Sequence, residues 1–225
     1  MPPGTPDIRA LDPSTPCARH RTEAQKSPYR EHYFAAERVE VKTLAGLLAW
    51  ILESRASVPE GQRVLLARWV YAWKKFPDGR ISHVKARYTV QGQHQVEGVD
   101  YMESYAATMT LKGFRSILAI ANLDPNVTVD HFDVSAAYIN AELDTLVYCV
   151  QPPGYVDPSR PTAVCRLLKA QYGLRQAGHA WARLLKKLLA AVGAKPIPVE
   201  PAIYMMRGTN NGWCVIPTQV DDLFC

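Results

Sequence analysis

The stretch Val129-Asp130-His131-Phe132-Asp133-Val134-Ser135-Ala136-Ala137-Tyr138 decides how this chain folds. Val127 and Val129 alternate with polar neighbours, and this period of two predicts a half-buried strand. Asp133 closes that strand, and the small residues after it suit a tight turn into a short helix. An aspartate at the end of a strand is often only a capping residue, so its meaning depends on what lies beside it.

A second stretch, Thr218-Gln219-Val220-Asp221-Asp222-Leu223-Phe224, predicts a strand–turn–strand hairpin with two acids at its tip. Adjacent aspartates repel one another unless a cation lies between them. We expect Asp133 and Asp221 to face one another, because a carboxylate at a strand end and a pair on a neighbouring hairpin can hold two Mg²⁺ ions about 4 Å apart for phosphoryl transfer. The simpler alternative is a capping Asp133 with an acidic surface turn, and the two stretches alone leave both interpretations open.

The composition is that of an ordinary globular protein, with 225 residues, 48% hydrophobic and 21% charged. A formal charge of +5 is mild, so a nucleic-acid surface would require clustered cations. The five cysteines form no Cys-x-x-Cys pair, which argues against a zinc site and favours an intracellular location, with a cytoplasmic particle and the nucleus both left open. The apolar runs are shorter than the roughly 18 residues of a membrane span, so we expect no membrane partner.

The N-terminal part of the chain divides into a proline-rich tail and a helix. Residues 1–30 hold six prolines and few aliphatic side chains, which predicts a disordered tail. From residue 31 to about residue 53, apolar side chains follow helical spacing, although Gly46 weakens that helix. We expect this helix to pack on the domain behind it.

Residues 64–75 and 81–91 flank Phe76-Pro77-Asp78-Gly79-Arg80, whose turn residues predict a β-hairpin. Five cations decorate this hairpin: Lys74, Lys75, Arg80, Lys85 and Arg87. They either protect a solvated edge or bind phosphate. Lys85 and Arg87 lie two positions apart and therefore share one face of the strand, and the sequence does not choose between them.

Two further helices are predicted, over residues 112–123 and 177–192. The first has Phe114, Ile117, Leu118 and Ala121 facing inward. The second has an apolar stripe at 181, 184, 185, 188, 189 and 192, and a basic one at Arg183, Lys186 and Lys187. Residues 160–195 contain eight Arg or Lys and no Asp or Glu, so the basic stripe is either a solvated face or a track for a nucleic-acid backbone.

From about Glu40 onward the chain resembles the reverse transcriptase of copia-type LTR retrotransposons. The resemblance rests on nine short blocks in the order and spacing of that family. They are Arg68-Trp69-Val70-Tyr71, Asp78-Gly79, Val84-Lys85-Ala86-Arg87, Gly98-Val99-Asp100-Tyr101, Asp133 to Asn140, Gln151-Pro152-Pro153-Gly154-Tyr155, Tyr172-Gly173-Leu174-Arg175-Gln176-Ala177, Ala180-Trp181 and Val220-Asp221-Asp222.

This resemblance implies an α+β fold with the fingers and palm of a right-hand polymerase. The palm would be antiparallel and ferredoxin-like. Residues 31–225 would form the fingers and palm, with the fingers hairpin at about 63–92, the palm at about 111–225 and truncation before the thumb. The partners implied are an RNA or DNA template with its primer, deoxynucleoside triphosphates, and the integrase and RNase H regions of a parent Pol polyprotein.

The resemblance also assigns roles to residues. Asp133, Asp221 and Asp222 would be catalytic and, with the carbonyl of Val134, would bind two Mg²⁺ ions, or Mn²⁺ in their place. The nucleotide-binding residues would be Lys74, Lys75, Lys85, Arg87, Tyr138 and Gln176. Tyr138 would be the steric gate beneath the sugar, or else a tyrosine packed under the next strand, and Gln176 would lie beside the incoming base. The template-binding residues would be Arg175, Arg183, Lys186 and Lys187.

Several positions depart from the family pattern. Gln219 stands where Tyr is usual before the Asp-Asp pair, and Pro217 falls in a strand, where proline is tolerated only at an edge or bulge. Cys225 comes three residues after Asp222, so we expect a fingers–palm fragment that polymerises poorly alone. The alternatives are a non-catalytic nucleic-acid-binding relic of a decayed element and a purely structural remnant.

Overall fold

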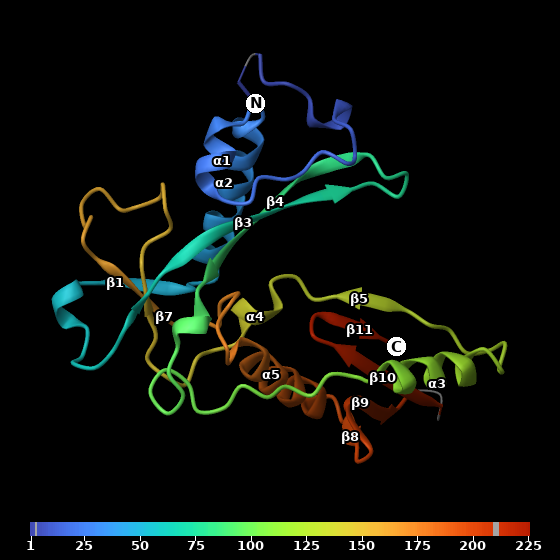
Figure 1. Cartoon of the computed structure of the whole chain (residues 1–225). Helices are drawn as coiled ribbons and strands as arrows, with labels where there is room; N and C mark the ends of the chain where they lie inside the picture. The colour runs from blue at the N-terminus through green and yellow to red at the C-terminus, as the bar shows by residue number, and fades with distance from the viewer. Residues whose placement is uncertain (3, 209–211) are drawn as a thin grey trace. The chain divides into compact units, whose positions relative to one another are not determined.

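The computed structural model describes residues 1–2, 4–208 and 212–225 as two units of mixed α and β structure (Figure 1). Unit 1 consists of Met1–Met102 and Leu143–Arg175, and unit 2 of Glu103–Glu142 and Gln176–Cys225. Pro3 of the predicted tail and residues 209–211 of the predicted palm lie outside the described residues. Among the described residues, no helix has both the length and the apolar character that a bilayer crossing requires.

The hairpin predicted from its turn residues is confirmed in unit 1. Strands β3 (Ala67–Lys75) and β4 (Ile81–Val90) pair in antiparallel register, with Trp69 opposite Tyr88. Gly79 has φ 87°, a conformation that glycine adopts without a Cβ penalty, so local chemistry closes the turn. Alternate β4 side chains are buried, which gives the hairpin one core-facing side.

Helix α2 (Arg30–Gly46) packs on β4 and buries Tyr33, Glu37 and Leu44. The prediction that this helix continues to residue 53 was wrong, because the helix ends at Gly46 and the chain turns into strand β1 (Trp50–Glu53). Strand β1 joins a four-stranded sheet of order β1-β7-β6-β2. Its other members are β7 (Val164–Leu167), β6 (Tyr148–Cys149) and β2 (Val64–Leu65).

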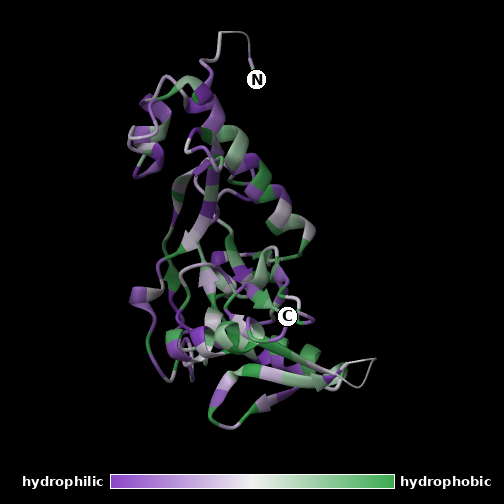
Figure 2. Cartoon of the chain, turned by 90° about the vertical axis from the view of Figure 1, so that its right-hand side faces the viewer, coloured by the Kyte–Doolittle hydropathy of each residue, from purple (hydrophilic) through white to green (hydrophobic). Residues whose placement is uncertain are grey.

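The N-terminal segment, which composition predicted to be disordered, forms structure in unit 1. It contains the 3₁₀ helix η1 (Ile8–Ala10) and helix α1 (Arg21–Lys26), and it carries hydrophilic stretches coloured purple in Figure 2. The Arg21 guanidinium pairs with the fully buried Glu37 carboxylate at 3.1 Å. The segment is ordered, contrary to the prediction, because a few specific long-range contacts anchor it, and composition does not reveal such contacts. Unit 1 also has two 3₁₀ turns, η2 (Arg55–Ser57) and η3 (Gly92–His94).

Unit 2 is built on a five-stranded antiparallel sheet of order β5-β11-β10-β9-β8. Its strands are β5 (His131–Asp133), β11 (Asp222–Phe224), β10 (Trp213–Gln219), β9 (Glu200–Arg207) and β8 (Lys195–Ile197). Ala194, Tyr204 and Ile216 form a buried cluster against which Leu189 of helix α5 (Ala177–Ala191) packs. The sheet therefore holds the two sequence stretches that carry the aspartates.

Helix α3 (Leu111–Ala121) confirms the predicted helix but not its predicted burial. Thr110 caps its first turn by accepting a hydrogen bond from the Gly113 amide at 3.0 Å. None of its residues, all of which the structure describes, is buried, and Leu118 is 37% exposed. The inward face expected from periodicity is thus only partly covered, with Phe114 in contact with Phe224 at 4.8 Å between ring centroids.

Two predictions about strands need correction. The strand expected from residue 127 is shorter: Val127 and Val129 are both about half exposed, and β5 begins at His131. Asp130 directly before it exchanges two backbone hydrogen bonds with Cys225, at 2.7 and 2.9 Å. Pro217 lies in β10, an interior strand, and pairs with Ile203 of β9. The pairing of β10 with β11 begins at Thr218, so Pro217 lies beyond the end of that ladder although it belongs to the ladder with β9.

Candidate active site

The register of β5 and β11 brings two of the three predicted catalytic aspartates together. Asp133 and Asp222 are direct partners across the antiparallel pair. Side chains that are opposite one another in such a pair leave the sheet on the same face, with Cβ atoms about 5 Å apart. The third aspartate is joined through its backbone, because the Val134 amide donates to the Asp221 carbonyl at 2.8 Å. We expected Asp221 to lie opposite Asp133, but the register places Asp222 there.

A histidine that sequence reasoning did not assign to the site contacts one of these acids. His131 Nε2 lies 2.8 Å from Asp222 Oδ1, and the imidazole ring stacks on Phe224 with centroids 4.7 Å apart. A carboxylate only accepts hydrogen bonds, so the imidazole donates. The available sequence signal was the spacing of two between His131 and Asp133, which places both on one strand face.

The donor chemistry of this site fits a hard divalent cation. Asp133 is exposed, Asp221 and Asp222 are partly exposed, and carboxylate oxygens are the ligands that Mg²⁺ prefers. The geometry is less complete, because no group of three His, Cys, Asp or Glu side chains within the described ranges is arranged to hold a metal ion. The described residues thus provide suitable ligands, two of them on facing register positions, but do not include a convergent three-ligand cluster.

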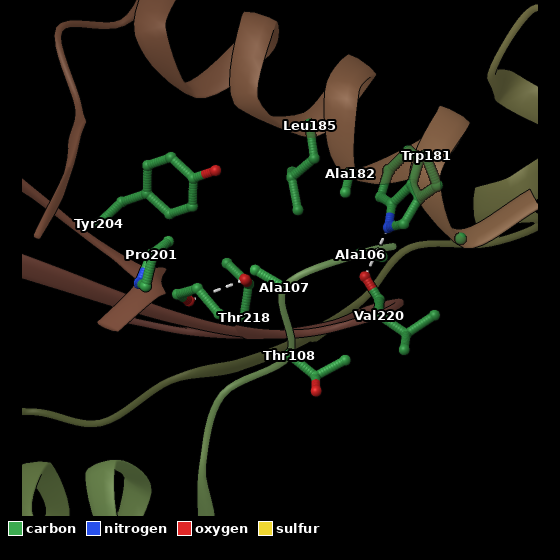
Figure 3. Close-up of a pocket in the computed structure, with 12 residues that line it drawn as sticks. Ala106, Ala107, Thr108, Trp181, Ala182, Leu185, Pro201, Tyr204, Thr218 and Val220 are labelled. Carbon is green, nitrogen blue, oxygen red and sulfur yellow. Dashed lines mark hydrogen bonds between the residues drawn. The ribbon is translucent and has the colours of Figure 1, made fainter. Parts of the chain in front are cut away.

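The turn that carries Asp221 is strained and is held by a tryptophan. Val220 has φ 56°, a left-handed conformation that costs a non-glycine residue about 1–3 kcal/mol. The Trp181 indole N–H donates to the Val220 carbonyl (Figure 3). Trp181 is 3% exposed, so this donor would be buried without a partner if the bond were absent. Sequence reasoning placed Trp181 in the core but could not detect a bond to a residue 39 positions away.

A small cavity lies beneath the same turn. Its volume is about 50 Å³, and Trp181, Leu185, Tyr204, Thr218 and Val220 contribute to its lining (Figure 3). The Thr218 hydroxyl does not face it freely, because it donates to the Ala202 carbonyl at 2.8 Å. The turn therefore lies over an apolar pocket and depends on a few polar contacts.

The cations of the hairpin lie in different environments in unit 1. Lys74 and Lys75 are both exposed, and the Lys75 ammonium donates to the Pro13 carbonyl at 2.8 Å. The Arg87 guanidinium lies over the Tyr172 ring at 5.1 Å. These contacts bring Lys75 and Arg87 into the folded unit, and their predicted role in nucleotide binding remains a prediction.

Glu40 of α2 lies close to the two cations Lys85 and Arg87. Burial raises the pKa of Glu40, while a hydrogen bond from the Tyr88 amide and the charges of Arg87 and Lys85 act in the opposite direction. Both cations therefore lie near this carboxylate. The structure gives no basis for choosing one of them as the phosphate ligand.

The other two predicted nucleotide-binding residues lie in unit 2. Tyr138 is partly buried in helix α4 (Ala137–Asn140), which follows the left-handed Ala136. Gln176 is 3% exposed at the start of α5, where its carbonyl accepts from the Ala180 amide at 2.9 Å. The roles of both residues toward a nucleotide remain predictions.

The predicted basic stripe of α5 is exposed, as its helical phase requires. Arg183, Lys186 and Lys187 are all exposed, and Trp181 and Leu185 are buried. Leu188 was expected to be buried and is 53% exposed. Arg175, the fourth predicted template-binding residue, is exposed in unit 1, and its amide donates to Gln95 Oε1 at 2.9 Å.

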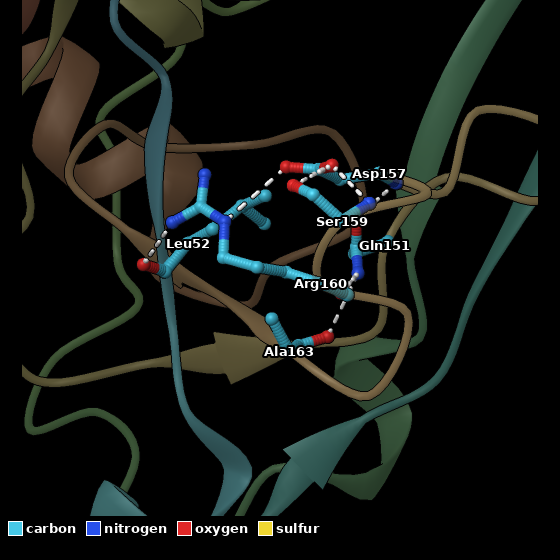
Figure 4. Close-up of polar contacts among 6 residues, drawn as sticks. All are labelled: Leu52, Gln151, Asp157, Ser159, Arg160 and Ala163. Carbon is cyan, nitrogen blue, oxygen red and sulfur yellow. Dashed lines mark hydrogen bonds and ion pairs between the residues drawn. The ribbon is translucent and has the colours of Figure 1, made fainter.

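The Gln151-Pro152-Pro153-Gly154-Tyr155 block has a structural role in unit 1 (Figure 4). The Gln151 amide group donates to the carbonyls of Arg160 and Ala163, at 2.9 and 3.0 Å, and accepts from the Asp157 amide at 2.8 Å. One buried side chain thereby closes the loop that follows β6. The block therefore shapes unit 1 and supplies no acid or base.

Asp133 and Asp222 face one another near the edge of an antiparallel sheet, and Asp221 lies on the adjoining turn. Carboxylates are the ligands that divalent cations use in phosphate chemistry. The chain belongs to the family described as reverse transcriptase (RNA-dependent DNA polymerase), whose model matches residues 53–225. Its relatives identify this domain as the copia type.

Three relatives illustrate the similarity. The chain is 37% identical over 166 residues to the retrovirus-related Pol polyprotein from transposon RE2 of Arabidopsis thaliana, covering 73% of this chain and 11% of that protein. It is 30% identical over 167 residues to the corresponding polyprotein from transposon TNT 1-94 of Nicotiana tabacum, covering 74% and 12%. It is 26% identical over 161 residues to the transposon Ty1-DR4 Gag-Pol polyprotein of Saccharomyces cerevisiae, covering 71% and 10%. The chain thus spans about a tenth of the length of these relatives.

Proposed function

We propose that this chain contains the fingers and palm of a copia-type polymerase that extends a primer with deoxynucleotides along an RNA or DNA template. The observation that carries the proposal is the pairing of Asp133 with Asp222 in a domain of the reverse transcriptase family. The relatives are Pol polyproteins, which supports action as one part of a longer Pol protein. Integrase and RNase H regions in that longer protein belong to the proposal.

The carboxylates of Asp133, Asp221 and Asp222, with the Val134 carbonyl, would hold two Mg²⁺ ions. Bound Mg²⁺ lowers the pKa of the attacking 3′-hydroxyl and stabilises the leaving pyrophosphate. The protein's own contribution is to fix these acids on neighbouring strands. Hydrogen bonds from His131 to Asp222 and from Val134 to Asp221 hold two of them in place.

The remaining residues would bind and orient the reactants. Exposed Lys74 is the hairpin cation best suited to meet a triphosphate, with Lys75, Lys85 and Arg87 adding positive charge nearby. Tyr138 would exclude a 2′-hydroxyl, and Gln176 would support the base pair. The exposed face of Arg183, Lys186 and Lys187, together with Arg175, would follow the template backbone.

The test is single-nucleotide primer extension with enzyme in excess over a primed RNA homopolymer and with Mn²⁺ present. Excess enzyme matters because holding the primer in line supplies much of the rate, and we expect slow turnover by this chain alone. Incorporation that both Asp133→Asn and Asp221→Asn abolish supports the proposal. Incorporation that persists in both variants contradicts it.

A non-catalytic nucleic-acid-binding protein is the second candidate. The observation in its favour is that Asp222 is already engaged by His131 and that no three-ligand cluster is formed in the described part of the chain. This candidate predicts salt-dependent RNA binding that is unchanged in Asp133→Asn, with no measurable Mn²⁺ affinity. Equilibrium dialysis with Mn²⁺ distinguishes the two candidates independently of turnover.

A further inference from the structure

The turn between β10 and β11 holds Val220 in a conformation that a β-branched residue rarely adopts. Its φ of 56° lies in the left-handed region, which glycine adopts without strain and valine adopts only with strain. Val220 directly precedes Asp221, so the path of the backbone through this strained residue sets where the Asp221 carboxylate points. Such a conformation persists only when surrounding groups fix it.

Two donors from different elements hold this turn. The Trp181 indole of α5 donates to the Val220 carbonyl, as Figure 3 shows. The Val134 amide, directly after β5, donates to the Asp221 carbonyl at 2.8 Å. These carbonyls belong to the peptide groups on either side of the Asp221 Cα, so the two bonds together fix the orientation of that residue.

We propose that Trp181 is a positioning residue, whose indole N–H keeps Val220 left-handed and thereby aims the Asp221 carboxylate. This inference rests on the proposed function, because Asp221 matters only where carboxylates bind a cation. Trp181 touches no reactant in this role and acts through Val220 alone. The helix that presents the basic face would then also fix the turn that carries the acids.

A purely structural role for Trp181 makes a different prediction. If the side chain only fills the core, then Trp181→Phe should act on stability, and its effect should not depend on the residue at position 220. If the indole holds a strained turn, then Val220→Gly should remove the need for it, since glycine adopts φ above zero without strain. The two substitutions should therefore be coupled.

The experiment compares the wild-type chain with Trp181→Phe, Val220→Gly and the double variant. Mn²⁺ affinity is measured by electron paramagnetic resonance of the free ion, and stability by urea unfolding. We expect Trp181→Phe to weaken Mn²⁺ binding about tenfold and the double variant to recover most of that loss. Leu189→Ala is the matched control: it removes α5 packing on the cluster of Ala194, Tyr204 and Ile216 and lies outside the cavity lining, so it should lower stability and leave Mn²⁺ affinity unchanged. Additive effects of Trp181→Phe and Val220→Gly would overturn the proposal.

A second readout separates this inference from the proposed function. The Trp181 indole proton, assigned by its disappearance in Trp181→Phe, should exchange slowly with solvent deuterium in the metal-free wild-type chain. Slow exchange without Mn²⁺ binding would contradict the proposed function and still support the hydrogen bond from Trp181 to the turn. Rapid exchange in a chain that binds Mn²⁺ would overturn the positioning role and leave the proposed function in place.

Discussion

Asp133 of β5 and Asp222 of β11 are direct partners in the antiparallel register, so two carboxylates leave the sheet on one face. Like charges that face one another in this way destabilise a strand pair, and a cation between them removes the repulsion. The same relationship therefore predicts both how the site binds a metal ion and how that ion affects folding.

We expect Mn²⁺ at a hundredfold excess over its dissociation constant to raise the free energy of unfolding by about 2.7 kcal/mol. Asp133→Asn should abolish this increase, and without the ion it should stabilise the chain slightly by removing the repulsion. Urea unfolding with Mn²⁺ or with a chelator measures both effects. Asp124→Asn, which changes another exposed acid of unit 2, is the control. A full Mn²⁺ effect in Asp133→Asn would place the ion elsewhere.

The exposed lysines of α5 predict how salt affects nucleic-acid binding. Each phosphate contact that is lost reduces the slope of log K against log salt concentration by about 1. We expect Lys186→Ala with Lys187→Ala to reduce the slope by about 2, as measured by fluorescence anisotropy on a primed RNA. Lys195→Ala, at an exposed lysine of β8, should leave the slope unchanged. An unchanged slope in the double variant would mean that this face is only solvated.

The sequence predicted the elements that depend on local chemistry. The hairpin of β3 and β4 follows from Pro77-Asp78-Gly79, and α5 follows from its apolar stripe, because neighbouring residues decide both. The pairing of β1 with β7 was not predicted, since Trp50 meets Leu167 far along the chain and the apolar spacing of residues 47–52 also suits a helix. The local pattern of apolar residues therefore cannot distinguish a strand from a helix in this segment.

The candidate site was predicted in part. The motif blocks identified Asp133 and the Asp221–Asp222 pair, but the register that pairs Asp133 with Asp222 depends on where two distant strands meet. The contacts of His131 and Trp181 were missed for the same reason: each joins residues widely separated in sequence. Spacing within one segment carries no information about such bonds.

The N-terminal segment offers a stability prediction. Arg21 pairs with Glu37, whose side chain is fully buried and also accepts from the Tyr71 hydroxyl. Arg21→Met leaves a buried carboxylate without its cation, and we expect a loss of about 3 kcal/mol in urea unfolding. Arg9→Met, which breaks an exposed pair with Asp7, should have no measurable effect. Equal effects of the two substitutions would show that the segment is not anchored through Arg21.

Two buried glutamines of unit 1 make a matched pair. Neither amide atom of the fully buried Gln171 has a hydrogen-bond partner, whereas Gln151 makes three hydrogen bonds. A buried polar group without a partner costs about 1–3 kcal/mol, so Gln171→Met should stabilise the chain by about 1 kcal/mol. Gln151→Met should destabilise it. Thermal unfolding measures both, and a loss of stability in Gln171→Met would indicate a buried water that satisfies the amide.

The two thiols beside the hairpin of β10 and β11 predict a disulfide under oxidising conditions. Cys214 Sγ on β10 lies 2.9 Å from Sγ of the exposed Cys225, which follows β11. With oxidised glutathione, Cys225 would first form a mixed disulfide and release one glutathione thiol. Cys214 would then attack the Cys225 sulfur and release the second, leaving one disulfide in place of two thiols.

The rate of the second step should depend strongly on pH. Burial raises the pKa of the Cys214 thiol, and only the thiolate attacks. The rate should therefore increase about tenfold for each pH unit from pH 7 towards that pKa. Mass spectrometry of quenched samples follows the loss of two hydrogen atoms from the chain, and Cys214→Ser should accumulate the mixed disulfide instead. A rate that does not change between pH 7 and pH 9 would contradict the assignment of Cys214 as the attacking thiol.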